Sequence, residues 1–189
     1  MKTLAAAAAC AVAFAAAPAW GASYVIDFTH TFASFEVLHL GLSTSRGRFD
    51  KSEGTLEFDR AERKGRVDIT IDASSVNTGL AVLDKELRGE KFLDSGKHPS
   101  ARFVSERFVF KGDKLSEVVG SFTLLGKTLP VTLRALRFNC YLHPFFRREV
   151  CGGDFEATIQ RTQWGMNTYA PDLVSDPVRL VLQIEAIRQ

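Results

Sequence analysis

The stretch FEVLHLG, residues 35–41, indicates the fold most directly because its apolar and polar residues alternate. Phe35, Val37 and His39 fall on one side of an extended chain, and the intervening residues fall on the other side. Alternation of this kind is typical of a β-strand with one buried face. The preceding segment YVID, residues 24–27, has the same character. The first part of the chain therefore predicts strands that share an apolar face.

The same period of two continues along most of the chain. Alternating runs occupy residues 55–59, 67–72, 101–105, 120–124, 131–135, 155–159 and 178–186. Turn signals such as Gly126-Lys127 and Gly152-Gly153 separate these runs. About eight strands at this spacing predict an all-β fold, either an antiparallel barrel or a sandwich. Closure into a barrel would remove the exposed strand edges.

Residues 79–98 depart from this period. Leu80, Leu83 and Leu87 recur at helical spacing, and Pro99 ends the stretch. We therefore expect a short helix and a loop that cross one end of the barrel.

The first 22 residues have the features of a secretory signal peptide. Lys2 precedes an apolar run over residues 4–17, and small residues follow it as a cleavage site. The run is shorter than the ~20 apolar residues that a membrane-spanning helix needs. We expect export, cleavage after Ala19, and a single domain over residues 23–189.

The charge of the exported chain is almost balanced. Loss of Lys2 leaves 23 Lys and Arg against 22 Asp and Glu, a net charge of +1. Nucleic-acid binding depends on clustered cations, so this balance argues against a nucleic-acid partner. Since no stretch after the signal is comparably apolar, we also expect no stable membrane insertion.

Two cysteines, Cys140 and Cys151, remain after removal of the signal. An even count in an exported chain predicts a structural disulfide. A metal or redox pair is the weaker alternative, because Cys-x-x-Cys spacing is missing and His143 is the one histidine nearby. The four histidines also lack the paired spacing of a zinc site, so we expect no metal.

An ordered series of segments resembles the YceI-like family of exported polyisoprenoid-binding proteins. The matching segments lie at residues 24–27, 30–31, 35–41, 47–49, 54–59, 71–79, 84–88, 92–94, 98–99 and 120–133. The resemblance implies an extended, eight-stranded antiparallel barrel, lipocalin-like, whose hollow interior takes a long apolar chain. Leu83 stands where the family commonly has an arginine, and His98 stands where it commonly has a tyrosine. These departures leave the fold intact but change the polar groups at the barrel mouth.

The composition is compatible with a lipid-holding interior. The chain has 15 Phe against 3 Tyr and 2 Trp, and Phe offers a large apolar surface with no polar atom. A barrel of this size either fills itself with side chains or holds one small ligand. The family resemblance implies a polyisoprenoid or a prenyl quinone as ligand, and we expect no other cofactor. The inward positions expected to contact it are Phe35, Val37, His39, Phe58, Ile69, Phe103, Phe122 and Leu182.

Four polar residues could meet the polar end of such a ligand at the mouth. His39 shares the inward face, although it could equally be a neutral histidine bonded to a neighbour. Arg46 could bind a pyrophosphate through two hydrogen bonds, or lie on a solvated strand face. Asp84 and Arg88 are four positions apart on the expected helix, where they could orient a headgroup or form a weak surface ion pair.

These features predict a periplasmic, non-catalytic binding or carrier protein for a polyisoprenoid or a similar long-chain amphiphile. A second hypothesis is a filled barrel that acts as a protein-interaction module in an envelope stress response, with an apolar patch around Leu38 and Val181. A lipid-modifying enzyme is the third hypothesis. It ranks last because no Gly-x-Ser-x-Gly stretch occurs and the alternating pattern places the acidic residues on the outer face. Uncovered strand edges or an open mouth would favour a homodimer.

Overall fold

The computed structural model describes residues 21–145 and 147–189, so residues 1–20 of the expected signal segment lie outside the described residues, and Gly21 and Ala22 lie within them. Within these ranges one sheet of eleven strands dominates the fold, accompanied by one α-helix and two short 3₁₀ helices. The strands are β1 (Ala22–Ile26), β2 (Phe32–His39), β3 (Ser43–Phe49), β4 (Ser52–Asp59), β5 (Lys64–Asp72), β6 (Val76–Asn77), β7 (Ser100–Lys111), β8 (Lys114–Leu124), β9 (Lys127–Leu142), β10 (Glu149–Gln160) and β11 (Val174–Arg188). The helices are η1 (Ala73–Ser75), α1 (Ala81–Arg88) and η2 (Arg161–Trp164).

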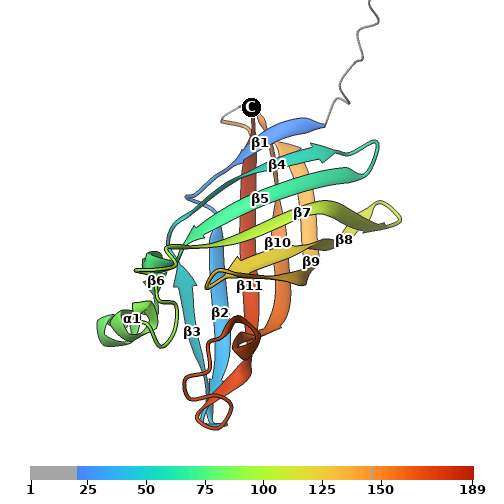
Figure 1. The fold of residues 1–189 in the computed structure, drawn as a ribbon. Coiled ribbons are helices and arrows are strands. Elements are labelled where there is room, and N and C mark those ends of the chain that lie inside the picture. The colour runs from blue at the N-terminus through green and yellow to red at the C-terminus, as the bar shows by residue number, and fades with distance from the viewer. Residues whose placement is uncertain (1–20, 146) are drawn as a thin grey trace, which may run out of the picture.

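Eight of the strands close into an antiparallel ring in the order β1-β4-β5-β7-β8-β9-β10-β11 (Figure 1). The ring is completed where β1 pairs with the end of β11, with Tyr24 opposite Arg188 and Ile26 opposite Ala186. This closure confirms the expected all-β, eight-stranded antiparallel barrel. It also satisfies the backbone groups that an open sheet would leave at its edges.

The strands β2, β3 and β6 lengthen one wall of the barrel. β2 pairs with β11 between Val174 and Gln183, β3 pairs with β2, and β6 pairs with β3. Each of them adjoins a ring strand in the sequence, so β1–β2, β3–β4 and β5–β6 are long strands broken into two segments. The β2–β3 hairpin consequently projects past the ring, at the bottom of Figure 1.

Helix α1 lies outside the strands, beside β6 (Figure 1). It begins at Ala81 and ends at Arg88, and Gly89 caps its C-terminus with a backbone N–H to the Glu86 carbonyl. Leu87 of the helix and Leu93 of the following loop pack against the barrel core. The expected short helix and loop over residues 79–98 are therefore confirmed.

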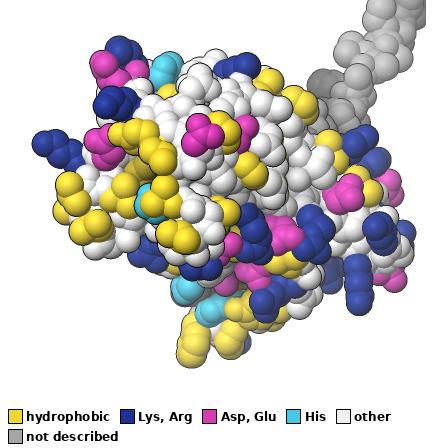
Figure 2. All heavy atoms as spheres, turned by 90° about the horizontal axis from the view of Figure 1, so that it is seen from below, with side chains coloured by type: hydrophobic (Ala, Val, Ile, Leu, Met, Phe, Trp, Pro, Cys, Tyr) yellow, Lys and Arg dark blue, Asp and Glu magenta, His cyan; other side chains and the backbone are white. Residues whose placement is uncertain are grey.

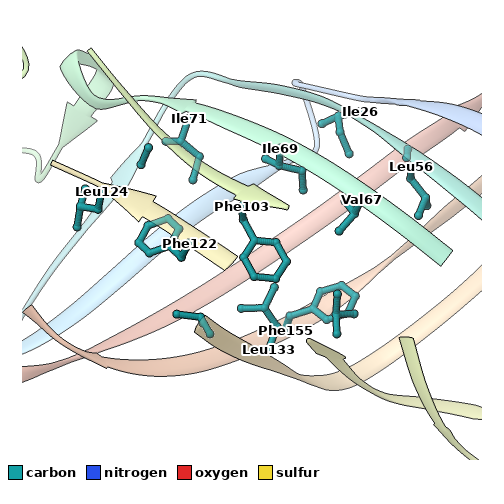
Figure 3. Close-up of a cluster of buried hydrophobic side chains, with 14 of the residues drawn as sticks. Ile26, Leu56, Val67, Ile69, Ile71, Phe103, Phe122, Leu124, Leu133 and Phe155 are labelled. Carbon is teal, nitrogen blue, oxygen red and sulfur yellow. The ribbon is translucent and has the colours of Figure 1, made fainter. Parts of the chain in front are cut away.

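The core lies inside the barrel. On β5, Val67, Ile69 and Ile71 are buried, whereas the intervening Asp68 and Thr70 are partly exposed. The inward side chains of the other ring strands join them in one apolar cluster (Figure 3). Removing this surface from water stabilises the fold by roughly 25 cal/mol per Å².

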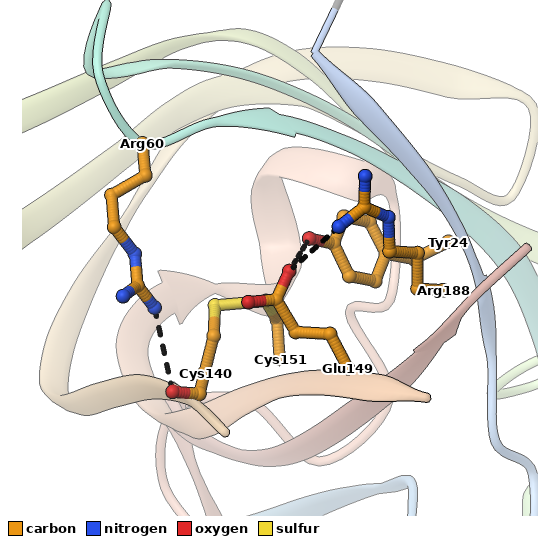
Figure 4. The surroundings of a disulfide bond; sticks show 6 residues. All are labelled: Tyr24, Arg60, Cys140, Glu149, Cys151 and Arg188. Carbon is orange, nitrogen blue, oxygen red and sulfur yellow. Dashed lines mark hydrogen bonds and ion pairs between the residues drawn. A yellow bond between two sulfur atoms is a disulfide. The ribbon is translucent and has the colours of Figure 1, made fainter. Parts of the chain in front are cut away.

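Cys140 and Cys151 form a disulfide between β9 and β10, where the two residues are directly opposite each other. The prediction of this bond is confirmed, and the Cys151 side chain is completely buried. Figure 4 shows Tyr24 beside the disulfide, donating a hydrogen bond from its hydroxyl to Glu149. Burial, and then this bond to Glu149, raises the pKa of Tyr24 to about 12. The neutral phenol therefore persists at this end of the barrel.

Candidate ligand-binding site

An apolar cavity occupies the part of the barrel nearest to α1. Its volume is about 140 Å³. Every strand except β1 contributes to its walls, and Leu87, Leu93 and Met166 close it from outside the strands. Among the described residues that line it, Thr31, Ser34 and Ser52 are the polar ones, and none carries a titratable group. Such a cavity suits a hydrocarbon chain.

The polar groups in the wall are largely engaged with the backbone. The Thr31 hydroxyl donates to the Glu185 carbonyl at 3.2 Å and accepts from the Glu185 N–H at 3.1 Å. The Ser52 hydroxyl donates to the Thr31 carbonyl at 3.5 Å. These bonds satisfy the hydroxyls within the protein, so the wall offers a ligand mainly apolar surface.

Five of the eight inward positions expected from the sequence line the cavity: Phe35, Ile69, Phe103, Phe122 and Leu182. They come from five different strands, β2, β5, β7, β8 and β11. The period of two was sufficient to place them because each belongs to an uninterrupted alternating run. Their contact with a ligand remains a prediction.

Val37 and Phe58 lie elsewhere in the barrel. Val37 is half-buried on β2, opposite Val178 of β11, outside the cavity lining. Phe58 lies deep in the core, with its ring 5.3 Å from the ring of Phe138 and 6.3 Å from that of Phe108. Their expected place in the cavity wall was wrong, because alternation fixes the face of a residue but not its height along the barrel.

His39 is exposed, so its expected inward position is also wrong. It is the last residue of β2, opposite Val174 of β11 and Ser43 of β3. It does share the face of Phe35, but at this point the hairpin has already passed the end of the ring. The same face is therefore interior at Phe35 and solvated at His39.

Arg46 lies on the outer surface, where its Nε donates to Glu36 at 2.9 Å. Glu36 also accepts from Arg179 at 2.8 Å, and Arg179 donates to Glu156 at 2.7 Å. Arg134 donates to the other oxygen of Glu156. Its strand turns the Arg46 side chain outward into an ion-pair network, which fits the solvated-face alternative, and its contact with a headgroup remains a prediction.

Asp84 and Arg88 attach α1 to the barrel. The Asp84 carboxylate accepts from the Thr78 N–H at 2.7 Å and from the Thr78 hydroxyl at 2.6 Å. These hydrogen bonds from Thr78 lower the pKa of Asp84. Arg88 donates to the carbonyls of Ser74 and Val76 at 3.4 and 3.2 Å. Neither residue lines the cavity, and both hold the helix that places Leu87 in its wall. Their contact with a headgroup remains a prediction.

Sequence reasoning missed the segment that follows β10. Arg161 is 2% exposed and donates to the carbonyls of Ser175, Met166, Thr168 and Val174 at 2.7–3.0 Å. Trp164 is also buried and donates from its indole N–H to the Phe122 carbonyl at 3.3 Å. Arg161 therefore folds this connection so that Met166 reaches the cavity wall. The residues next to Arg161 in the sequence are polar, so the sequence did not indicate that this arginine is buried.

Large hydrophobic residues are exposed at the end where α1 and the β2–β3 hairpin lie. Leu42 is 83% exposed, Val82 70% and Leu80 56%. Figure 2 views the molecule from this end and shows hydrophobic side chains interspersed with Lys and Arg. Of the patch expected on the outer wall, Leu38 is exposed but Val181 is half-buried.

Two other kinds of site were sought in the described part of the chain. No three His, Cys, Asp or Glu side chains there lie close enough together to hold a metal ion. No helix within residues 21–145 and 147–189 has the length and apolar character needed to cross a bilayer.

A closed β-barrel with an apolar cavity is the architecture of a ligand-binding barrel protein. The sequence model described as YceI-like domain matches residues 24–186, so the chain belongs to the YceI-like family. The family resemblance found in the sequence is thus confirmed.

Relatives of similar length support this assignment. A UPF0312 protein of Pseudomonas paraeruginosa is 37% identical over 193 residues, covering 100% of this chain and 98% of the relative. Protein YceI of Escherichia coli is 35% identical over 181 residues, covering 93% and 92%.

Two solved structures share the fold at low sequence identity. BcnA of Burkholderia cenocepacia superposes with a TM-score of 0.68 at 22% identity, covering 85% of this chain and 98% of BcnA. A polyisoprenoid binding domain from Saccharophagus degradans, implicated in plant cell wall breakdown, superposes with a TM-score of 0.63 at 16% identity, covering 89% and 99%.

Proposed function

We propose that this protein is a periplasmic, non-catalytic binding or carrier protein for a polyisoprenoid or a similar long-chain amphiphile. The observation that carries the proposal is the apolar cavity inside the closed barrel, walled by residues such as Phe35, Phe122 and Leu182. The polyisoprenoid binding domain from Saccharophagus degradans has the same fold, and this likeness supports the ligand class.

Binding would be driven by burial of the ligand chain. Each buried CH₂ contributes about 0.8 kcal/mol, whereas association costs at least about 4 kcal/mol in lost freedom. Micromolar affinity corresponds to about 8 kcal/mol of net binding energy, so several isoprene units must be enclosed. The polar end of the ligand would then stay outside the apolar wall.

Two features support the non-catalytic and periplasmic parts of the proposal. The described residues that line the cavity carry no titratable group, so they supply no general acid or base beside a bound chain to activate the Thr31, Ser34 or Ser52 hydroxyls. The signal-like residues 1–22 and the Cys140–Cys151 disulfide fit an oxidising compartment.

A charge placed in the cavity wall tests the proposal. Phe122 is buried on β8 and lines the cavity, so Phe122→Asp should lower the affinity for a prenyl alcohol such as farnesol by at least ~100-fold, because an ionised carboxylate would contact hydrocarbon. Ser121 is the adjacent residue and is exposed, so Ser121→Asp is the matched control and should bind as wild type does.

Affinity would be measured by titration, and folding by circular dichroism and thermal melting. A folded Phe122→Asp protein that binds as tightly as wild type would refute the cavity as the binding site. If this variant does not fold, Leu182→Asn makes the same comparison from β11, with the exposed Gln183→Asn as its control.

A further inference from the structure

A second, smaller apolar space of about 40 Å³ lies deeper in the barrel than the cavity described above. Four residues belong to the walls of both spaces: Ile69, Phe103, Leu133 and Ile184. The two spaces are therefore arranged in series, and these shared residues form the partition between them.

Phe103 is the large ring in this partition. It is 6% exposed on β7 and lies opposite Ile69 of β5 and Phe122 of β8. In Figure 3 its ring lies between two groups of labelled side chains, Leu124, Phe122 and Ile71 on one side and Val67, Leu56 and Ile26 on the other. The first group lines only the larger cavity and the second only the deeper space.

Gly120 makes this position of the ring possible. A Cβ atom added at Gly120 would lie 2.7 Å from Cζ of Phe103, closer than two carbons can approach. The ring therefore lies over bare backbone of β8, and the absence of a side chain there lets it reach across the barrel interior.

The deeper space is closed on its far side by aromatic rings. Phe58 is buried there and packs against Phe108 and Phe138. Phe108 and Phe138 also line the deeper space. An apolar chain that passed Phe103 would meet more apolar surface, up to this aromatic plug.

We infer that Phe103 is the residue that sets the length of ligand chain the barrel accepts, by stopping the chain end at the partition. This inference rests on the proposed function. A chain that reaches Phe103 has filled the cavity, so a further isoprene unit stays outside and gains no burial. Removal of the ring would join the two spaces and allow another unit to be buried.

A series of prenyl alcohols tests this inference, because its members share a headgroup and differ in chain length. Affinities of geraniol, farnesol, geranylgeraniol and solanesol would be measured for wild type, Phe103→Ala and Phe155→Ala. Phe155→Ala is the matched control, since it removes an equal ring that lines only the deeper space and leaves the partition intact.

Wild-type affinity should stop rising at one member of the series. For Phe103→Ala the affinity should continue to rise by at least ~10-fold at the next longer member, whereas Phe155→Ala should keep the wild-type limit. If Phe103→Ala does not fold, Phe103→Leu makes the same comparison with a smaller change.

The failures of the two proposals differ in this experiment. If affinity stops rising at the same chain length in wild type and in folded Phe103→Ala, the chain-length inference is overturned and the proposed function is not. A limit that shifts equally in Phe155→Ala would also overturn it. Absence of binding of every alcohol to wild type would overturn the proposed function itself, and the inference with it.

Discussion

Arg161 shows how much a single buried side chain can determine near the cavity. Its guanidinium donates to four main-chain carbonyls of the segment between β10 and β11. Burial lowers the pKa of Arg161, but a guanidinium remains charged under ordinary conditions. These hydrogen bonds hold the connection that carries Met166 into the cavity wall.

Arg161→Met should therefore destabilise the protein by about 3 kcal/mol, because methionine fills much of the space but leaves the buried carbonyls unpaired. Denaturant unfolding measures this change. Gln163 lies in the same 3₁₀ helix and is exposed, so Gln163→Ala should unfold within about 0.5 kcal/mol of wild type. An unchanged unfolding midpoint for Arg161→Met would contradict the structural role assigned to its hydrogen bonds.

Individual residues could be assigned to a face from the sequence but not to a height along the barrel. Phe35 and Phe122 line the cavity as expected, whereas Phe58 shares their inward orientation and lies in the aromatic plug. His39 also keeps the predicted parity, but beyond the end of the ring. Height depends on the stagger between paired strands, which the period of two does not encode.

At the scale of elements, an ion-pair network joins five neighbouring strands on the outer face. Arg46, Glu36, Arg179, Glu156 and Arg134 lie in this order on β3, β2, β11, β10 and β9. Hydrogen bonds from Arg46 and then Arg179 lower the pKa of Glu36. Those from Arg179 and then Arg134 lower the pKa of Glu156.

This network should make the barrel less stable in acid. Because both carboxyl pKa values are lower in the folded protein, their stabilisation is present above the ordinary value of 4.5 and is lost as the pH falls through the folded values. Arg179→Met removes the central cation, so its melting temperature should fall less than that of wild type between neutral pH and pH ~3.

The measurement is a series of thermal melts across this pH range, with Arg107→Met, an exposed arginine on β7, as the control. The control should follow wild type. Parallel melting curves for Arg179→Met and wild type at every pH would show that the network makes no such contribution.

The elements themselves were largely predictable. The ring strands and the helix within residues 79–98 follow from the polarity pattern, because each is a local property of the chain. The full length of β7 was missed because bulges after Ser105 and Val109 interrupt its alternation. The longer wall formed by β2, β3 and β6 was also missed, since strand pairing joins segments far apart in the sequence.

At the scale of the whole molecule, the question left open by the sequence was whether the barrel is filled or hollow. Fifteen Phe residues fit either case. The answer depends on how much of the interior volume the inward side chains fill. Gly120, Phe103 and the covering helix α1 all affect this volume. The structure leaves an apolar cavity near α1 and packs aromatic rings at the other end.

The central claim is that this cavity holds an isoprenoid chain. Native mass spectrometry, combined with organic extraction, would test it on the full chain, expressed with its own N-terminal segment and purified without detergent. The account predicts a stoichiometric bound lipid of isoprenoid mass, lost on denaturation and regained on titration. A ligand-free mass that persists after incubation with prenyl quinones and polyprenyl phosphates would contradict it.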